Sequence, residues 1–73
     1  MPSKYPILKP EEVIKRLHAF GFTEVKQSRS HLKMSNGHNK CIIPMHDEVA
    51  KGTLKSILSQ ANIDLEKFMS VKI

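Results

Sequence analysis

The chain has 73 residues, enough for one domain with a thin hydrophobic core and too few for a deep pocket. Its net charge of +5 favours phosphate-rich or acidic partners, although the same charge also suits plain solubility. The single cysteine excludes a disulfide within the chain, no apolar run reaches the ~20 residues of a membrane span, and the N-terminus lacks the apolar core of a signal peptide. We therefore expect a single cytoplasmic domain over residues 1–73, monomeric when free, with a shallow site suited to a macromolecular substrate.

The first helix is expected to begin at Pro10, because proline suits the first helical turn and the acidic residues after it favour the helix dipole. Its apolar stripe at helical spacing consists of Val13, Ile14, Leu17 and Phe20. Gly21 should end this helix, since glycine tolerates a left-handed backbone. His18 lies off the stripe and is assigned no role. Upstream, Ile7 and Leu8 are expected to be the first side chains that touch the core.

Three strands are expected after the helix. Residues 22–27 and 31–35 alternate apolar and polar side chains, which predicts half-buried strands, and residues 39–43 form a return strand. Asn36 and Gly37 favour a hairpin between the last two strands, with a loop of two or four residues. The hairpin face expected to meet the helices carries Leu32, Met34, Cys41 and Ile43. The face expected to meet solvent or a ligand carries His31, Lys33, Ser35, Lys40 and Ile42.

A second helix follows, for which Thr53 is the predicted N-cap. Its apolar stripe consists of Leu54, Ile57, Leu58 and Ala61. Asn62 should end it in a left-handed conformation, and Asp64 should cap a last short helical turn. The element order predicts an α+β domain with α-β-β-β-α topology, in which both main helices cover one face of a three-stranded antiparallel sheet.

His31 is the residue best suited to acid–base chemistry. It begins a strand on the face expected to meet solvent, and Lys33 follows two residues later on the same face. Histidine exchanges protons near neutral pH, and basic neighbours attract phosphate. These properties suit a general base for a ribose 2′-hydroxyl. The alternative is an idle surface histidine, which is the commoner outcome when a histidine is judged on spacing alone.

Other chemistry is less well supported by the residues. His31, His38 and His46 lack the spacing of common histidine metal sites, although Asp47 and Glu48 lie close enough in sequence to leave such a site open. There is no nucleotide-binding glycine loop, and no cofactor is expected. Cys41 should face the core, where a thiol is inert. The helix start at residues 51–53 suits a phosphate bound by backbone N–H groups, or equally an ordinary capped helix.

Several motifs together resemble those of HicA-like toxins, the small RNA-cleaving partners of HicB-type antitoxins. They are Phe20-Gly21-Phe22, Ser30-His31, Pro44-Met45-His46 and, after five intervening residues, Gly52-Thr53-Leu54. The resemblance covers nearly the whole chain and implies a fold like that of a double-stranded-RNA-binding domain. The catalytic histidine of the family follows Gly-Ser, and here Arg29 stands in the place of that glycine.

The resemblance implies the toxin of a type II toxin–antitoxin system, a metal-independent endoribonuclease with His31 as its catalytic residue. Its implied partners are mRNA and a HicB-type antitoxin protein. The residues expected to bind RNA are Arg29, Ser30, Lys33, Lys40, His46 and Lys51. His46 is also a candidate donor of the proton to the leaving 5′-oxygen, or simply a residue that hydrogen-bonds its own loop. The alternative is a non-catalytic module of the same fold that binds RNA or the antitoxin, and Arg29 is the feature that favours it.

Overall fold

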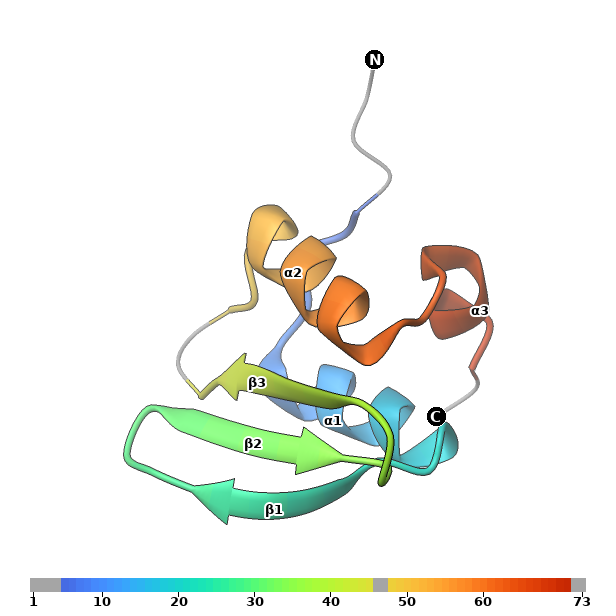
Figure 1. Cartoon of the computed structure of the whole chain (residues 1–73). Coiled ribbons are helices and arrows are strands. Elements are labelled where there is room, and N and C mark those ends of the chain that lie inside the picture. Colours follow the sequence, from blue (N-terminus) through green and yellow to red (C-terminus); the bar gives the residue numbers. More distant parts are fainter. Residues whose placement is uncertain (1–4, 46–47, 72–73) are drawn as a thin grey trace.

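The computed structural model describes residues 5–45 and 48–71, and its elements follow one another in the expected order (Figure 1). They are α1 (Pro10–Ala19), β1 (Thr23–Gln27), β2 (His31–Ser35), β3 (Lys40–Pro44), α2 (Lys51–Ala61) and α3 (Leu65–Met69). The strands form one antiparallel sheet with β2 at its centre. This is the α+β arrangement of a double-stranded-RNA-binding domain, so the predicted fold is confirmed. No helix in the described part of the chain is long and apolar enough to cross a membrane.

The helices lie on one face of the sheet and leave the other face open (Figure 1). Both α1 and α2 pack chiefly against β3. The sheet contributes to the core the four side chains predicted for its inner face, Leu32, Met34, Cys41 and Ile43. The alternate residues of β2 and β3 are exposed or half-buried on the opposite face. Both predicted faces of the hairpin are therefore confirmed.

The strand β1 differs from its predicted half-buried pattern, since all five of its side chains are exposed. It is an edge strand, and the helices pack chiefly at the opposite edge of the sheet. Only Phe22, immediately before the strand, is buried. The expectation for Ile7 is also wrong, because this residue is 53% exposed, whereas Leu8 reaches the core and pairs with Val49.

Both main helices end at a residue with a left-handed backbone conformation, as predicted. Gly21 has φ +85° and its N–H donates to the carbonyl of His18, while Asn62 has φ +58° at the end of α2. Pro10 is the first residue of α1, and Asp64 occupies the N-cap position of α3, although its side chain makes no capping hydrogen bond. These residue types therefore mark the helix ends through their backbone conformations.

The helix α2 begins three residues earlier than the sequence predicts, because its N-cap is Ala50 and not Thr53. The N–H of Leu54 donates to the carbonyl of Ala50 over 2.8 Å, which places Thr53 inside the first turn. Immediately before the helix, the N–H of Val49 donates to the carbonyl of Leu8 over 2.6 Å. This contact fixes the chain at the helix start, so a side-chain cap at Thr53 is not required.

The loop between β2 and β3 is the four-residue alternative. Ser35 pairs with Lys40, and residues 36–39 lie between them. The side-chain Oδ1 of Asn36 accepts hydrogen bonds from the backbone of residues 38 and 39, at 2.9 and 2.7 Å, and Gly37 has φ +93°. The turn residues therefore set the register of the two strands that carry the candidate site.

Candidate functional site

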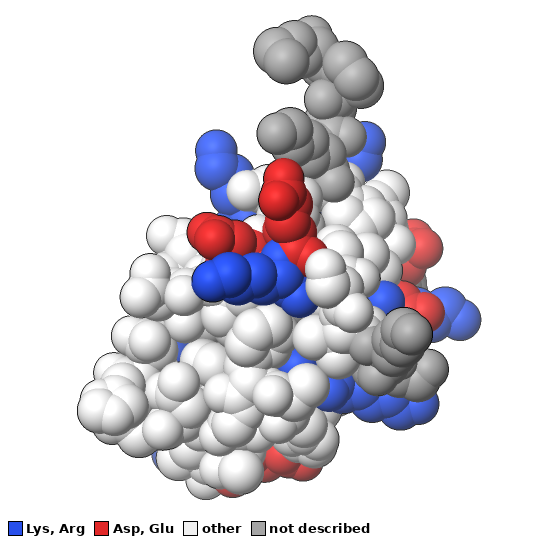
Figure 2. All heavy atoms as spheres, turned by 90° about the vertical axis from the view of Figure 1, so that its right-hand side faces the viewer, with Lys and Arg blue, Asp and Glu red and all other residues white. Residues whose placement is uncertain are grey.

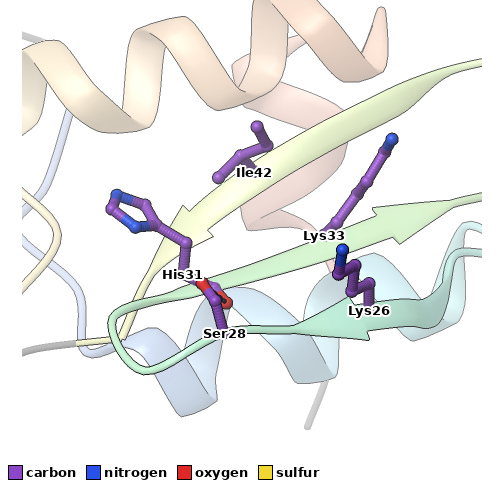
Figure 3. Close-up of a pocket in the computed structure, with 5 residues that line it drawn as sticks. All are labelled: Lys26, Ser28, His31, Lys33 and Ile42. Carbon is purple, nitrogen blue, oxygen red and sulfur yellow. Dashed lines mark hydrogen bonds between the residues drawn. The ribbon is translucent and has the colours of Figure 1, made fainter.

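A shallow depression of about 230 Å³ lies on the open face of the sheet (Figure 3). The residues that line it are Lys26, Ser28, His31, Lys33 and Ile42. They come from all three strands and from the loop between β1 and β2. The lining contains two lysines and one histidine but no carboxylate, so the depression suits an anionic ligand. Its size and its place on an open face agree with the shallow site that the chain length predicts.

Two serines make hydrogen bonds with His31, Ser28 with its backbone carbonyl and Ser30 with its ring. Its carbonyl oxygen accepts hydrogen bonds from the backbone N–H and the hydroxyl of Ser28, at 2.9 and 3.2 Å. Its ring Nδ1 lies 3.0 Å from the Oγ of Ser30. Within the described residues, no hydrogen bond engages the other ring nitrogen, Nε2. The histidine is therefore fixed at one side of its ring and available to a ligand at the other.

The end of β3 supports the loop that precedes His31. Pro44 pairs with His31 across the sheet, so it belongs to the strand that it was expected to follow. The N–H of Met45 then donates to the carbonyl of Ser30 over 2.7 Å. Proline is tolerated here because β3 is an edge strand and Pro44 is its last residue. The short loop that carries Ser30 is thus tied to strands on both sides.

A β-bulge at Val25 explains how Lys26 joins this face. Glu24 pairs with Met34 and Lys26 pairs with Lys33, which leaves Val25 without a partner on β2. In an unbroken strand, Lys26 and Glu24 would lie on the same face, toward the helices. The extra residue moves Lys26 to the open face, directly beside Lys33. The two lysines of the depression are therefore neighbours on adjacent strands.

The structure brings together three of the residues singled out from the sequence. His31 and Lys33 both line the depression, and Ser30 contacts the ring of His31. All three lie at or near the start of β2. The regular alternation of this strand puts the histidine and the lysine on one face, as the sequence predicts.

The other predicted RNA contacts do not line the depression. Arg29 is exposed in the loop before β2. Lys40 lies at the far end of β3, four residues from the partner of His31 and so roughly 13 Å along the strand. Lys51 begins α2, which packs on the opposite face of the sheet. His46 lies outside the described residues, so its predicted role is untested.

Sequence reasoning missed three residues of the lining. Ile42 was assigned to the open face without a role, and it is 47% exposed between the charged residues of the depression. Ser28 reads as part of a polar break, and its contact with His31 depends on the shape of the loop. Nothing in the sequence indicates that Lys26 lines the depression, because strict alternation places its side chain on the other face. The bulge at Val25 shifts the register and puts Lys26 on the open face.

Cys41, His18 and Glu24 are titratable residues that lie outside the depression. Burial raises the pKa of the Cys41 thiol to about 11, in agreement with the inert core cysteine that the sequence predicts. The Nε2 of His18 lies 2.6 Å from Oε1 of Glu24, and this hydrogen bond lowers the pKa of the carboxyl group. The contact joins α1 to β1 and gives His18 a partner that the sequence did not suggest. Among residues 5–45 and 48–71, no three His, Cys, Asp or Glu side chains converge as a metal site would require.

Charge is arranged differently on the side of the molecule that carries α3. Figure 2 shows Lys and Arg side chains next to Asp and Glu there, beside a broad area that has neither. Positive charge on that side is partly offset by its neighbours. The depression on the sheet differs, since both charged residues that line it are lysines.

The chain is similar to a known protein family over most of its length. A family model described as the HicA toxin of bacterial toxin–antitoxin systems matches residues 10–63, well over half of the 73 residues. The matched segment runs from the start of α1 through the whole sheet and past the end of α2. A search of curated proteins found no match.

Proposed function

Because this chain belongs to the HicA family of toxins from bacterial toxin–antitoxin systems, we propose that it is an endoribonuclease that cleaves mRNA without a metal ion. The observation that carries the proposal is the ring of His31, which contacts Ser30 through Nδ1 and borders a lysine-lined depression. An open depression on a sheet accommodates a polymer that passes across it. The matched family supports a toxin of a toxin–antitoxin system, and the residues of the depression support RNA cleavage as its proposed activity.

In the proposed reaction, Nε2 of His31 takes the proton of a ribose 2′-hydroxyl. The 2′-oxygen attacks the adjacent phosphorus, and the bond from phosphorus to the 5′-oxygen breaks. The leaving oxygen takes a proton from water or from a second group, for which His46 is a candidate, and the products are a cyclic phosphate and a 5′-hydroxyl end. A positioned general base of this kind accounts for roughly 10²–10⁴ in rate.

The contact with Ser30 bears on which nitrogen acts as the base. For Nε2 to accept a proton, Nδ1 must carry hydrogen and donate it to the Oγ of Ser30, 3.0 Å away. The serine hydroxyl accepts readily, because its oxygen has two lone pairs. Ser30 is then a positioning residue that fixes the orientation and the tautomer of the ring.

Negative charge that builds up on the phosphate requires a positive partner. Lys33 lies two residues from His31 on the same face and borders the same depression. An ammonium group placed there stabilises the developing charge. Arg29, exposed in the preceding loop, is suited to a flanking phosphate of the RNA. Base and charge are thus both supplied by side chains, which is why the proposal requires no metal.

Cleavage of a single-stranded RNA by the purified chain tests the proposal. Wild type should cleave, also with EDTA present, and His31→Ala should lose about 10²–10⁴ in rate. His38→Ala is a matched control, because His38 is also exposed, at the turn beyond β2. Since His31 is exposed, its removal should change the free energy of unfolding by less than about 0.5 kcal/mol. Wild-type rates in His31→Ala would contradict the proposed role.

A second candidate function, a non-catalytic module that binds RNA or an antitoxin, is favoured by Arg29 in the place of the family's glycine. The same assay separates the two. Wild type that binds RNA without cleaving it, and that causes no growth arrest when expressed without an antitoxin, would identify the module.

A further inference from the structure

We propose that Lys26 and Lys33 form a phosphate-binding pair that holds the RNA backbone beside His31, and that the bulge at Val25 builds this pair. The inference rests on the proposed function for the identity of the anion as an RNA phosphate. It adds Lys26 to the site, together with the backbone feature that puts it there.

The register of β1 and β2 brings the two lysines together. Lys26 and Lys33 are direct partners on neighbouring strands, and like charges in this position repel each other. The side-chain ammonium group of neither lysine makes a hydrogen bond or ion pair within the described residues, where the one salt bridge joins His18 to Glu24. An anion that contacts both ammonium groups removes the repulsion and gains a partner from each strand.

The bulge at Val25 has no evident role in packing. It interrupts the pairing of β1 with β2, and it buries nothing in return, because Val25 is 57% exposed. Since the bulge adds no buried side chain to the core, its effect is better explained by the following side chain, which it moves to the other face of the sheet. Here that side chain is Lys26, which would otherwise share the helix-covered face with Glu24.

The surroundings of the two lysines suit a ribose and its phosphate. Figure 3 shows Lys26 on β1, Lys33 on β2 and His31 at the start of β2, on the same face of the sheet. His31 is two residues from Lys33, roughly 7 Å along the strand, which is within the span of one phosphodiester and its ribose. On the other side of Lys33 its partner is Ile42, whose exposed side chain offers the sugar or base an apolar surface. A phosphate at the two lysines therefore puts the attached ribose near the proposed base.

The salt dependence of RNA binding tests the role of Lys26. Affinity is measured in the His31→Ala background, so that the RNA stays intact, for Lys26→Gln, Lys26→Arg and the control Lys15→Gln, which removes an exposed lysine from α1. Lys26→Gln should bind several-fold more weakly and should reduce the slope of log K against log salt by about 0.7. Lys26→Arg should restore the slope, and Lys15→Gln should leave it unchanged. Equal slopes in Lys26→Gln and in Lys15→Gln would overturn the inference.

Titration of the wild-type chain with inorganic phosphate, followed by NMR of the lysine side chains, separates this inference from the proposed function. Saturable shifts at Lys26 and Lys33, absent at Lys15, support the pair even if the chain does not cleave RNA. In that case the proposed function fails and the anion site stands. If wild type cleaves RNA, while Lys26→Gln keeps the same KM and phosphate shifts neither lysine, the inference fails and the proposed function stands.

Discussion

The Oγ of Ser30 lies 3.0 Å from Nδ1 of His31, so a serine hydroxyl from the adjacent residue orients the ring of the candidate base. Ser30→Ala removes this contact and leaves the ring free to rotate. A neutral hydrogen bond contributes about 1 kcal/mol, which corresponds to roughly a fivefold decrease in kcat. Because Ser30 acts through His31, we expect KM to change little. Steady-state cleavage kinetics measure both constants, and Ser30→Thr, which keeps the hydroxyl, should retain most of the activity. A Ser30→Ala variant with unchanged kcat would remove the serine from the mechanism.

Charge reversal at Lys33 should affect both partners expected of a toxin in this family. Lys33 lies on the open sheet face, where an acidic antitoxin could cover the depression and pair with the same charge that is proposed to attract RNA. We therefore expect Lys33→Glu to weaken RNA cleavage and antitoxin binding together, and Arg29→Glu to act in the same direction. Calorimetric titration of the antitoxin onto each variant measures the second effect. Full antitoxin affinity in both variants, with RNA binding lost, would show that the two partners use different surfaces.

The contact between His18 and Glu24 predicts an effect of acid on stability. Because His18 holds the pKa of Glu24 below its usual value of 4.5, the carboxylate contributes stability that is present above about pH 4.5. This contribution is lost as the pH falls through the lowered value in the folded state. His18→Ala should raise the pKa of Glu24 toward its usual value, and NMR titration of that carboxyl group detects the change. His38→Ala provides the control, and an unaltered Glu24 titration in His18→Ala would contradict the assigned cause.

Cys41 should resist alkylation in the folded chain. Burial raises the pKa of its thiol to about 11, so almost none is ionised at a pH of about 8, and the side chain is fully covered. Iodoacetamide should label the chain slowly in buffer and quickly in urea, where the thiol regains its ordinary acidity. Mass spectrometry of timed samples gives both rates. Equal labelling with and without urea would mean that the core around β3 opens easily.

The regular parts of the fold were predictable because local signals agree with one another there. Along β2, alternation predicts that Leu32 and Met34 point inward and that His31 and Lys33 point outward, and the structure shows this. The helix ends at Gly21 and Asn62 follow from the left-handed backbone that these residues tolerate. Each of these predictions depends on the residue itself and its near neighbours in sequence.

The rest of the site depends on relationships that no single segment contains. The bulge at Val25 depends on how β1 pairs with β2, so alternation alone could not place Lys26 on the open face. Lys40 shares the open face with His31, but the register of the hairpin puts the two at opposite ends of the strands. Thr53 is a good capping residue that the chain leaves unused, because the contact between Leu8 and Val49 starts the helix earlier.

The alternation along β2 also bears on how such a protein responds to selection. Leu32 and Met34 hold the sheet against the helices, whereas His31 and Lys33 contribute nothing to that contact. If the chain acts as proposed, one missense change on the open face is expected to abolish its toxicity and to leave the fold intact. We expect survivors of such a selection to accumulate full-length, soluble protein as often as truncated chains, which immunoblotting of independent survivors would reveal.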